Sequence, residues 1–543
     1  MNDPRERLSR RDFLAGIGRS VGGGAMLRVM AALGVGSSAA ACGSSSAAGA
    51  SPPVVPAPPA PPAVDAPRPG DWPASIGVGR SVVVLGAGLA GMTAALEMTR
   101  LGYDCTVLEA AARAGGRTRS LRGGDLHEET DSSQLCQFDL DSSLYFNPGP
   151  ARIPHHHDFL FGYCREFGVA LEPFINENRA GRLHSPARFG GTPELARRIN
   201  ADTRGHIAEL LSTAINQNAL DQELTGIDRA NVLGMLRSFG DLDAGNRYAG
   251  SRRAGFPGQA DPGSRDPDGL LAPLALAELV QETFWQDRLA FAEQLEQQAT
   301  MLQPVGGMDR IAAAFETAVQ AHIIYEAAVS EIRKTAGGAR VVYRDAAGSE
   351  HEIAADWCLC TIPATVLRDI PSDFAAGHAQ AIADFAYAPA VKVAFQARRF
   401  WEQDHNIYGG ISWTTQDITQ LWYPAQGFGD ANGVLLGAYL FGGSAGAAFG
   451  AMTPQQRIDA TLAQATAVHA QMSGEATRGI GVAWEKVPFQ LGAWGVSDPG
   501  ILREPDDALV LAGEHLSSLQ GWQEGAIRSA YRAIDDIVSR DAA

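Results

Sequence analysis

A glycine-rich turn between a predicted strand and a predicted helix constrains the fold more than any other feature of the sequence. Residues 81–85 form a short β-branched run, which is typical of a buried parallel strand. Gly86, Gly88 and Gly91 follow with the spacing Gly-x-Gly-x-x-Gly, and residues 92–101 have helical spacing without Pro or Gly. In such a turn Gly86 permits the sharp bend, Gly88 lets a pyrophosphate approach the backbone, and Gly91 lets helix and strand pack closely. The pattern predicts a dinucleotide-binding site.

A second predicted strand completes this unit. Residues 105–108 have the apolar, β-branched character of a strand, and Glu109 stands at its end. At this spacing an acidic side chain accepts from a ribose hydroxyl, while the helix N-terminus holds the phosphates. Strand, helix, strand and acid together predict an α/β domain with a parallel sheet.

The run Ala-Gly-Gly-Arg-Thr-Arg at residues 114–119 comes shortly after Glu109. It resembles the second glycine-arginine motif of the flavin amine-oxidase superfamily, a motif that folds binding only NAD do not need. The resemblance implies that Gly116 and Arg117 contact the cofactor, with Arg117 reaching its phosphate and flavin region. The cofactor that it implies is FAD.

The C-terminal end of the chain carries the matching half of this resemblance. Residues 508–512 read as a buried strand that leads into Glu514, and residues 521–530 begin Gly-Trp-Gln-Glu-Gly-Ala and open a predicted final helix. Both runs are similar to the C-terminal flavin motif of the family. The resemblance implies that Glu514 binds the ribityl or phosphate region and that Ala526 faces the flavin. Val329, between two predicted strands, fits the adenine-contacting position.

Cysteine and histidine usage predicts neither a covalent flavin nor a metal. Monoamine oxidases bond the flavin to a cysteine after a Gly-Gly pair, and the corresponding run here, residues 489–494, contains none. FAD is therefore expected to be bound non-covalently. The six cysteines are scattered without zinc spacing, which favours core thiols. The three histidines at 155–157 cannot all face one ion and have no suitably spaced carboxylate, so no metal is expected.

The segment Asn-Pro-Gly-Pro-Ala-Arg-Ile-Pro at residues 147–154 bears on the substrate. It resembles the Gly-Pro-x-Arg-apolar-Pro signature of L-amino-acid oxidases, in which the arginine grips the substrate carboxylate. A planar guanidinium pairs bidentately with a carboxylate and fixes its orientation. The resemblance implies that Arg152 binds an L-amino acid; a structural salt bridge is the alternative role.

Further substrate-binding residues follow from the same resemblance. Trp-Tyr-Pro at 422–424 is similar to the aromatic-Tyr-Pro of the family, so Tyr423 is expected to support the same carboxylate. Gly521 matches a carbonyl that accepts from the substrate amine, and Trp522 matches the aromatic wall beside it. Trp494 would suit a bulky apolar or aromatic side chain. Core packing is the alternative role of Tyr423 and Trp522.

Lys392 lies within the predicted strand 390–395, on the face opposite Val391 and Val393. A lysine in such a strand either faces solvent or is buried for a function. In the family, a lysine shortly before a Phe-Trp pair, here residues 400–401, holds a water near flavin N5. The resemblance implies that Lys392 is catalytic and that dioxygen reoxidises the flavin beside it.

The order of these motifs predicts discontinuous domains. We expect an α/β fold in which an FAD-binding, Rossmann-like domain of the two-dinucleotide-binding type is interleaved with a mixed-sheet substrate domain and a helical region. The expected boundaries are 76–137, 296–365 and 500–543 for the FAD-binding domain, 138–151 and 366–499 for the substrate-binding domain, and 152–295 for the helical region.

The expected reaction is oxidation of an L-amino acid by dioxygen to a 2-oxo acid, ammonia and hydrogen peroxide. Two other activities remain open: an amino-acid 2-monooxygenase, which yields an amide, and a dehydrogenase that reduces a quinone. A third alternative is a non-catalytic flavin-binding protein. The formal net charge of −17 argues against a nucleic-acid partner. Homodimeric assembly is left open.

The N-terminus predicts export. Ser-Arg-Arg-Asp-Phe-Leu at residues 9–14 precedes a weakly apolar stretch, which resembles a twin-arginine signal. Residues 1–42 are therefore expected to be a signal peptide read by the twin-arginine translocase. An Ala/Pro-rich linker is expected over 43–75. The mature protein would be periplasmic or extracellular, and lipidation at Cys42 is an alternative to simple cleavage.

Overall fold

The computed structural model describes residues 71–220, 224–257, 263–264, 267, 269–281 and 288–543, so the predicted signal peptide and most of the predicted linker lie outside the described residues. The described part of the chain divides into two compact units, one within residues 197–295 and the other within residues 71–196 and 296–543. Within the described ranges, no helix combines the length and the apolar character needed to cross a membrane.

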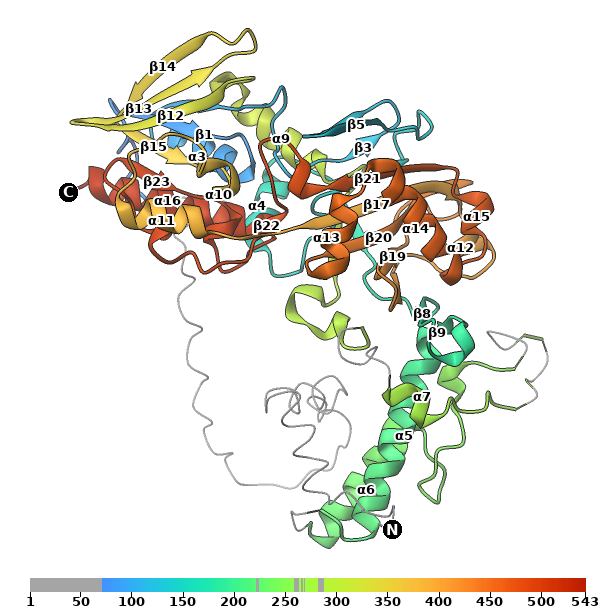
Figure 1. The fold of residues 1–543 in the computed structure, drawn as a ribbon. Helices are drawn as coiled ribbons and strands as arrows, with labels where there is room; N and C mark the ends of the chain where they lie inside the picture. Colours follow the sequence, from blue (N-terminus) through green and yellow to red (C-terminus); the bar gives the residue numbers. More distant parts are fainter. Residues whose placement is uncertain (1–70, 221–223, 258–262, 265–266, 268, 282–287) are drawn as a thin grey trace, which may run out of the picture. The chain divides into compact units, whose positions relative to one another are not determined.

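A five-stranded parallel sheet organises the larger unit (Figure 1). Its strand order is β11-β2-β1-β15-β23, and every neighbouring pair is parallel. The strands are β1 (Ser81–Leu85), β2 (Asp104–Leu108), β11 (Ile323–Ile324), β15 (Trp357–Cys360) and β23 (Leu509–Leu511). Because they come from early, middle and late parts of the sequence, the expected discontinuous α/β fold is confirmed.

The two faces of this sheet are covered by different elements. Successive side chains of a strand point to opposite faces, so Val82 and Val84 of β1 join one hydrophobic core while Val83 and Leu85 join another. The first core is completed by α3 (Leu89–Arg100), α4 (Asp158–Glu166), α9 (Asp309–Val319) and α16 (Gln523–Asp541). The second is completed by the antiparallel strands β12 (Ala328–Thr335), β13 (Gly338–Arg344) and β14 (Glu350–Ala355), and by α10 (Ala364–Leu367) and α11 (Ala376–Asp384).

A seven-stranded mixed sheet forms the other half of the larger unit (Figure 1). Its order is β21 (Arg478–Ala483), β17 (Ala390–Arg398), β20 (Asn432–Phe441), β19 (Gln420–Trp422), β18 (Ile411–Thr414), β8 (Arg182–His184) and β9 (Glu194–Leu195). The pair β8–β18 is parallel and the other pairs are antiparallel. Four helices accompany the sheet in sequence: α12 (Phe400–Gln403), α13 (Gly443–Ala451), α14 (Pro454–Val468) and α15 (Met472–Glu475). The expected mixed sheet is confirmed.

Four two-stranded sheets complete the described part of the larger unit. They are β3–β6 (Leu121–Arg122 and Tyr145–Phe146), β4–β5 (Leu126–Glu129 and Ser132–Leu135), β7–β10 (Leu171–Phe174 and Met301–Pro304) and β16–β22 (Tyr387–Ala388 and Trp494–Gly495). Strands β7, β8 and β9 fall inside the span 152–295 that was expected to be helical. Strand β7 pairs with β10 and strand β8 with β18, both far away in the sequence, so local periodicity did not indicate them; β9 pairs with β8.

The smaller unit is helical in its described part. It contains most of α5 (Ala196–Asn216), together with α6 (Gly226–Gly240) and α7 (Leu276–Val280). Ala208 and Ile215 of α5 pack with Leu236 of α6 in a small core of their own. Thr225 caps α6, because its side chain accepts from the backbone N–H of Asp228.

Candidate active site

A cavity of about 370 Å³ lies within the larger unit. Most of the predicted site residues line it: Gly86, Gly88, Glu109, Gly116, Arg117, Val329, Lys392, Trp494, Glu514, Gly521, Trp522 and Ala526. Three predicted residues, Gly91, Arg152 and Tyr423, are not part of its wall.

The glycine-rich turn between β1 and α3 shapes one part of the cavity. Gly86 has a φ of 98°, a conformation that favours glycine. Gly91 packs against the turn, since a Cβ there would lie 1.9 Å from the carbonyl oxygen of Gly86. Gly88 is the N-cap of α3, and a Cβ there would meet no atom within 4 Å. The space beside the N-terminus of α3 is therefore open at this residue, which allows an anion to approach the helix start.

Glu109 is buried beside this turn. Its carboxylate accepts from the backbone N–H groups of Ala87 at 2.7 Å and Ala111 at 2.9 Å. Burial raises the pKa of Glu109, and these two hydrogen bonds oppose the rise. Each carboxylate oxygen keeps a second lone pair with which it can accept from a ribose hydroxyl. Val329 of β12 lines the same cavity, so both residues could contact the nucleoside end of a dinucleotide.

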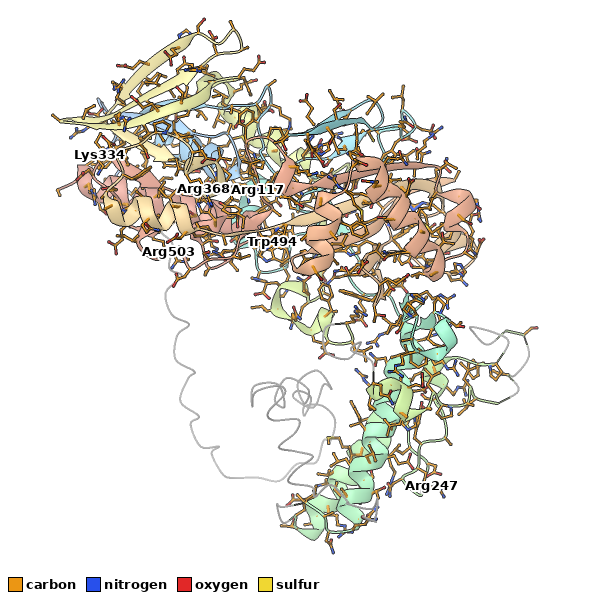
Figure 2. The ribbon with its side chains drawn as sticks, viewed as in Figure 1. Arg117, Arg247, Lys334, Arg368, Trp494 and Arg503 are labelled. Carbon is orange, nitrogen blue, oxygen red and sulfur yellow. The ribbon has the colours of Figure 1, made fainter. Side chains whose placement is uncertain are left out.

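Arg117 and Glu514 form an ion pair in the cavity wall. Nη1 of Arg117 donates to Oε1 of Glu514 and to the carbonyl of Ala493, each at 2.7 Å. Burial by itself lowers the pKa of Arg117, but the charge and hydrogen bond of Glu514, together with Tyr387, outweigh it and hold the pKa above its usual value. Glu514 also accepts from the N–H of Gly521 at 2.8 Å. Figure 2 shows Arg117 and Trp494 close to the middle of the larger unit, where the chain segments of this wall converge.

Lys392 lies on strand β17, between β21 and β20 in the mixed sheet, and is only 3% exposed. Its Nζ donates to the carbonyl oxygens of Gly149 at 2.6 Å and Asn147 at 3.2 Å. Nζ also lies 4.6 Å from the ring centre of Tyr439 and 5.5 Å from that of Trp422. Burial, with a smaller contribution from the charge of Arg152, lowers the pKa of Lys392 to about 7. This lysine can therefore change its charge near neutral pH.

The Arg152 guanidinium lies among aromatic rings next to the cavity. Its Cζ is 4.4 Å from the ring centre of Trp422, 5.9 Å from that of Phe174 and 6.0 Å from that of Trp522. Burial lowers the pKa of Arg152 to about 10, so the group is still charged at neutral pH. Trp522 forms part of the cavity wall, so the cation lies directly behind that wall.

Gly521 and the two predicted tryptophans occupy one region of the wall. Gly521 has a φ of 82°, and a Cβ there would lie 3.3 Å from Cγ of Trp494. Trp522 is the N-cap residue of α16, and the ring of His157 packs edge-on against it at 5.2 Å between centroids. Close packing of Gly521 on Trp494 thus places a backbone carbonyl and two indole rings at the same surface of the cavity.

The predicted role of Tyr423 is not supported by its position. Its hydroxyl is within hydrogen-bond distance of Ser412 and His469 in the core of the mixed sheet. Trp422, the preceding residue, contacts Arg152 instead. Neighbouring residues of an extended chain face opposite sides, so the side of the strand, and not the motif, decides which residue reaches the site. Tyr439 of β20, opposite Lys392 in the sheet register, lines the cavity in place of Tyr423.

Several residues of the wall were missed from the sequence. Trp484, Tyr439 and Thr361 line the cavity together with Gly149 and Gln523. Thr361 closes the glycine turn, since its Oγ1 donates to the carbonyl of Leu85 at 2.8 Å. Gly149 lies in the motif at residues 147–154 that also contains Arg152. The other residues contact parts of the chain that are far away in the sequence, so no local motif indicated them.

The residues present fit FAD. Gly88 leaves space for a pyrophosphate at a helix N-terminus, and Glu109 offers acceptors for a ribose. Elsewhere in the cavity wall, aromatic and apolar side chains lie around Lys392. The five cysteines of the described residues are buried, and none of them is part of the wall. This arrangement matches non-covalent binding. Within the described ranges, no group of three or more His, Cys, Asp or Glu is placed to hold a metal ion.

Comparison with known proteins agrees with this geometry. The family model for flavin-containing amine oxidoreductases matches residues 89–538. The chain is similar to the flavin-dependent L-tryptophan oxidase RebO of Lentzea aerocolonigenes, with 28% identity over 85% of this chain and 98% of that protein. It is also similar to an L-amino-acid oxidase of Echis ocellatus, with 24% identity over 84% of this chain and 89% of that protein.

Solved structures share the fold. Cyclohexylamine oxidase from Brevibacterium oxydans IH-35A superposes with a TM-score of 0.56 at 17% identity, over 85% of this chain and 99% of that one. Putrescine oxidase bound to putrescine gives a TM-score of 0.54 at 16% identity, with the same coverage of both chains. At such identities the likeness concerns the fold alone.

Proposed function

Because the chain belongs to the flavin-containing amine oxidoreductase family and its cofactor is FAD, we propose that it oxidises an L-amino acid with dioxygen. The products would be a 2-oxo acid, ammonia and hydrogen peroxide. When bound, FAD supplies the two-electron acceptor chemistry that the side chains lack.

The position of Arg152 carries the proposal for an amino acid rather than a simple amine. A guanidinium 4.4 Å from the Trp422 ring and 6.0 Å from the Trp522 ring is a cation held next to the cavity, behind the Trp522 part of its wall. In such apolar surroundings its attraction for an anion is stronger than in water. An α-carboxylate is the anion that every amino acid offers and that a simple amine lacks.

The other residues of this wall would orient the substrate amine. Gly521 offers its carbonyl as an acceptor for the amine, and the rings of Trp494 and Trp522 confine the side chain. Anchoring the carboxylate and the amine at two points fixes the direction of the Cα–H bond, and fixed orientation lowers the entropic part of the barrier. Lys392, with its pKa near 7, would hold a proton and a water where oxygen is reduced.

Aerobic product analysis tests this function. Purified FAD-loaded protein is incubated with each of the twenty L-amino acids, and 2-oxo acid, ammonia, amide and peroxide are quantified. Equal amounts of 2-oxo acid, ammonia and peroxide support the oxidase. An amide with carbon dioxide would indicate a monooxygenase, and turnover with a quinone but not with oxygen would indicate a dehydrogenase. Either result would contradict the proposal.

We further propose that the protein is exported by the twin-arginine translocase. Arg10 and Arg11, with the weakly apolar stretch after them, support this assignment. Export of a folded protein suits an enzyme that must bind FAD before it leaves the cytoplasm. Cell fractionation after Arg10→Lys/Arg11→Lys should show retention in the cytoplasm; unchanged export would contradict the assignment.

A further inference from the structure

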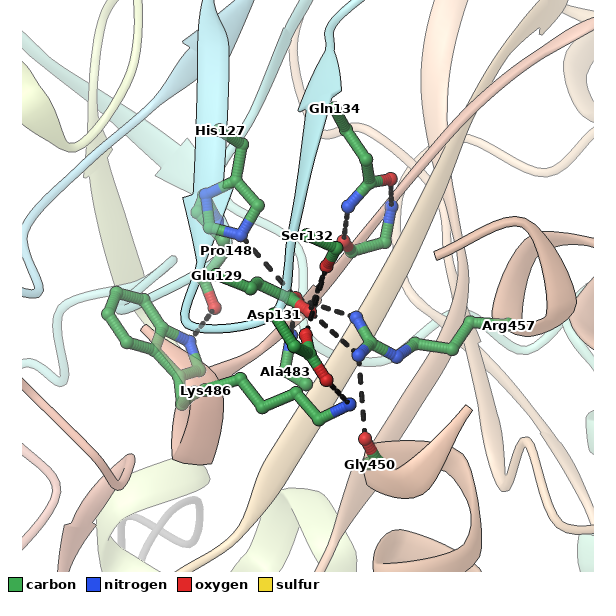
Figure 3. A network of polar contacts seen from close by, with 12 residues as sticks. His127, Glu129, Asp131, Ser132, Gln134, Pro148, Gly450, Arg457, Ala483 and Lys486 are labelled. Atoms are coloured by element: carbon green, nitrogen blue, oxygen red, sulfur yellow. Dashed lines mark hydrogen bonds and ion pairs between the residues drawn. The ribbon is translucent and has the colours of Figure 1, made fainter. Parts of the chain in front are cut away.

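A fully buried ion pair lies behind the cavity wall. Arg457 of α14 is 0% exposed, and its Nη1 and Nη2 donate to the two carboxylate oxygens of Glu129 at 2.6 and 2.8 Å. Figure 3 shows the Glu129 carboxylate between the Arg457 guanidinium and the backbone of Ala483. Burying two charges costs desolvation energy, so such a pair is weak evidence of a stability device. The hydrogen bonds that the ion pair makes to the surrounding backbone therefore indicate its role better than its energy does.

The ion pair is held in a fixed position on both sides. Helix α14 begins with a capping box, in which the side chains and backbones of Thr453 and Gln456 bond reciprocally, so Arg457 stands on a well-defined first turn. Oε1 of Glu129 also accepts from the N–H of Ala483 at 2.9 Å. Ala483 ends β21, and the next residue is Trp484. The ion pair thereby fixes the backbone from which the Trp484 side chain extends.

Trp484 links this backbone to the segment that holds Lys392. Its indole Nε1 donates to the carbonyl oxygen of Pro148 at 2.8 Å. The carbonyls on either side, those of Asn147 and Gly149, accept from Lys392. Three consecutive backbone carbonyls are therefore engaged: those of Asn147 and Gly149 accept hydrogen bonds from Lys392, and that of Pro148, between them, accepts one from Trp484. Gly149 is closely packed against its neighbours, since a Cβ there would lie 2.1 Å from the carbonyl oxygen of Arg117 and 3.4 Å from Trp484.

We propose that Trp484 is a positioning residue for Lys392: its indole N–H holds the Pro148 carbonyl, and this fixes the two neighbouring carbonyls that bind the lysine Nζ. The inference rests on the proposed role of Lys392 beside the flavin. It does not depend on which amine is the substrate.

The electrostatic surroundings of Lys392 give the direction of the effect. The charged or titratable groups beside it are Arg152, which disfavours its charge, and Tyr439, whose ring faces Nζ and whose own pKa is raised by burial. The carbonyl dipoles and the two aromatic rings favour the ammonium form. When the indole N–H is removed, the carbonyls are no longer held at bonding distance. The ammonium then loses acceptors, and the pKa of Lys392 falls below its value in the wild type.

The test is a pH titration of the flavin absorption spectrum in the resting, substrate-free protein. The pH-dependent change in flavin absorbance that is present in the wild type and absent in Lys392→Met reports the ionisation of the lysine. Trp484→Phe removes the indole N–H, and Trp484→His restores an N–H donor. Trp357→Phe is the matched control, because the Trp357 indole donates to Asp541 and its side chain is not part of the cavity wall. FAD content and circular dichroism establish that each variant is folded.

In Trp484→Phe we expect the Lys392-dependent pKa to fall by about one unit, a tenfold change in the acid dissociation constant. In Trp484→His it should return toward the wild-type value, and in Trp357→Phe it should equal the wild-type value. An unchanged pKa in folded, FAD-loaded Trp484→Phe would overturn the inference, as would an equal shift in Trp357→Phe. If Trp484→Phe does not fold, benzothienylalanine at position 484 keeps the bicyclic ring and lacks only the N–H. Because no substrate is present, failure here is distinguishable from failure of the proposed function.

Discussion

Lys392 donates a 2.6 Å hydrogen bond to the carbonyl of Gly149, three residues before Arg152. One short segment therefore joins the buried lysine to the arginine proposed to bind the substrate carboxylate. The two cations also interact through space, since the charge of Arg152 helps to lower the pKa of Lys392. Whatever neutralises Arg152 must raise the pKa of Lys392.

This coupling predicts that an unreactive carboxylate such as benzoate binds more tightly below pH 7 than above it. A bound carboxylate offsets the Arg152 charge and favours protonated Lys392, and by linkage the protonated protein favours the carboxylate. Dissociation constants from flavin difference spectra at pH 6 and pH 9 should differ severalfold in the wild type. In Lys392→Met the difference should disappear; if it persists, another group is responsible.

Lys392→Met should slow flavin reoxidation by oxygen and leave anaerobic flavin reduction nearly unchanged. Negative charge develops on oxygen as it is reduced, and a protonated lysine stabilises that charge. Because the pKa of Lys392 is about 7, the wild-type reoxidation rate should fall as the pH rises through 7, and the variant should show no such step. Stopped-flow absorbance measures both half-reactions. A larger effect on reduction than on reoxidation would reject this role.

Gly88→Ala and Gly91→Ala should separate cofactor binding from folding. A Cβ at Gly88 enters open space where the pyrophosphate is expected, so FAD affinity should fall tenfold or more, about 1.4 kcal/mol, with the unfolding temperature of the apoprotein unchanged. A Cβ at Gly91 would lie 1.9 Å from the Gly86 carbonyl oxygen, so the fold itself should lose about 1–3 kcal/mol. Isothermal titration with FAD and thermal melts check the two effects. Equal effects of both substitutions on both quantities would contradict the assignment.

Arg457→Met should lower the free energy of unfolding by about 3–5 kcal/mol at pH 7, because it leaves Glu129 charged and buried. Burial raises the pKa of Glu129, but the His127 imidazole 3.6 Å away and the hydrogen bonds from Arg457 and the Ala483 amide lower it to about 2. The stabilisation is therefore complete above the ordinary value of 4.5 and is lost as the pH falls toward 2. The difference between wild type and variant in urea unfolding should shrink over that range.

The exposed pair Arg344–Glu350 is the control for this substitution. Arg344→Met should change the free energy of unfolding by less than about 1 kcal/mol, since solvent screens exposed ion pairs. A loss as large as that of Arg457→Met would mean that burial is not the cause.

The parts of the fold that depend on local sequence were predicted well. The β-branched run, the glycine turn and Glu109 follow one another along the chain, and β1 and β2 lie where their residues indicated. The predicted helix after the turn begins at Leu89, three residues earlier than expected, because the Gly88 carbonyl accepts from the N–H of Met92. The structure of residues 81–109 was therefore predictable from neighbouring residues in the sequence.

The parts that depend on packing between distant segments were not predictable. Tyr423 was chosen from its motif, but only the pairing of β17 with β20 reveals that Tyr439 faces Lys392. Trp484 meets Pro148 across more than three hundred residues of sequence. Lys392 was correctly placed on a strand, but its partners Asn147 and Gly149 come from a loop far away in the sequence. No local periodicity encodes such contacts.

Anaerobic flavin reduction tests the central claim most directly. Wild type and Arg152→Ala are mixed in a stopped-flow instrument with an L-amino acid and with the amine that lacks its carboxylate, for example L-phenylalanine and phenethylamine. We expect the wild-type flavin to bleach rapidly with the amino acid only. In Arg152→Ala the half-saturating concentration of the amino acid should rise by a factor corresponding to about 2–4 kcal/mol, the loss of a buried charge-assisted pair. Equal bleaching by the amine, or an unchanged half-saturating concentration in Arg152→Ala, would contradict the assignment of an L-amino-acid substrate.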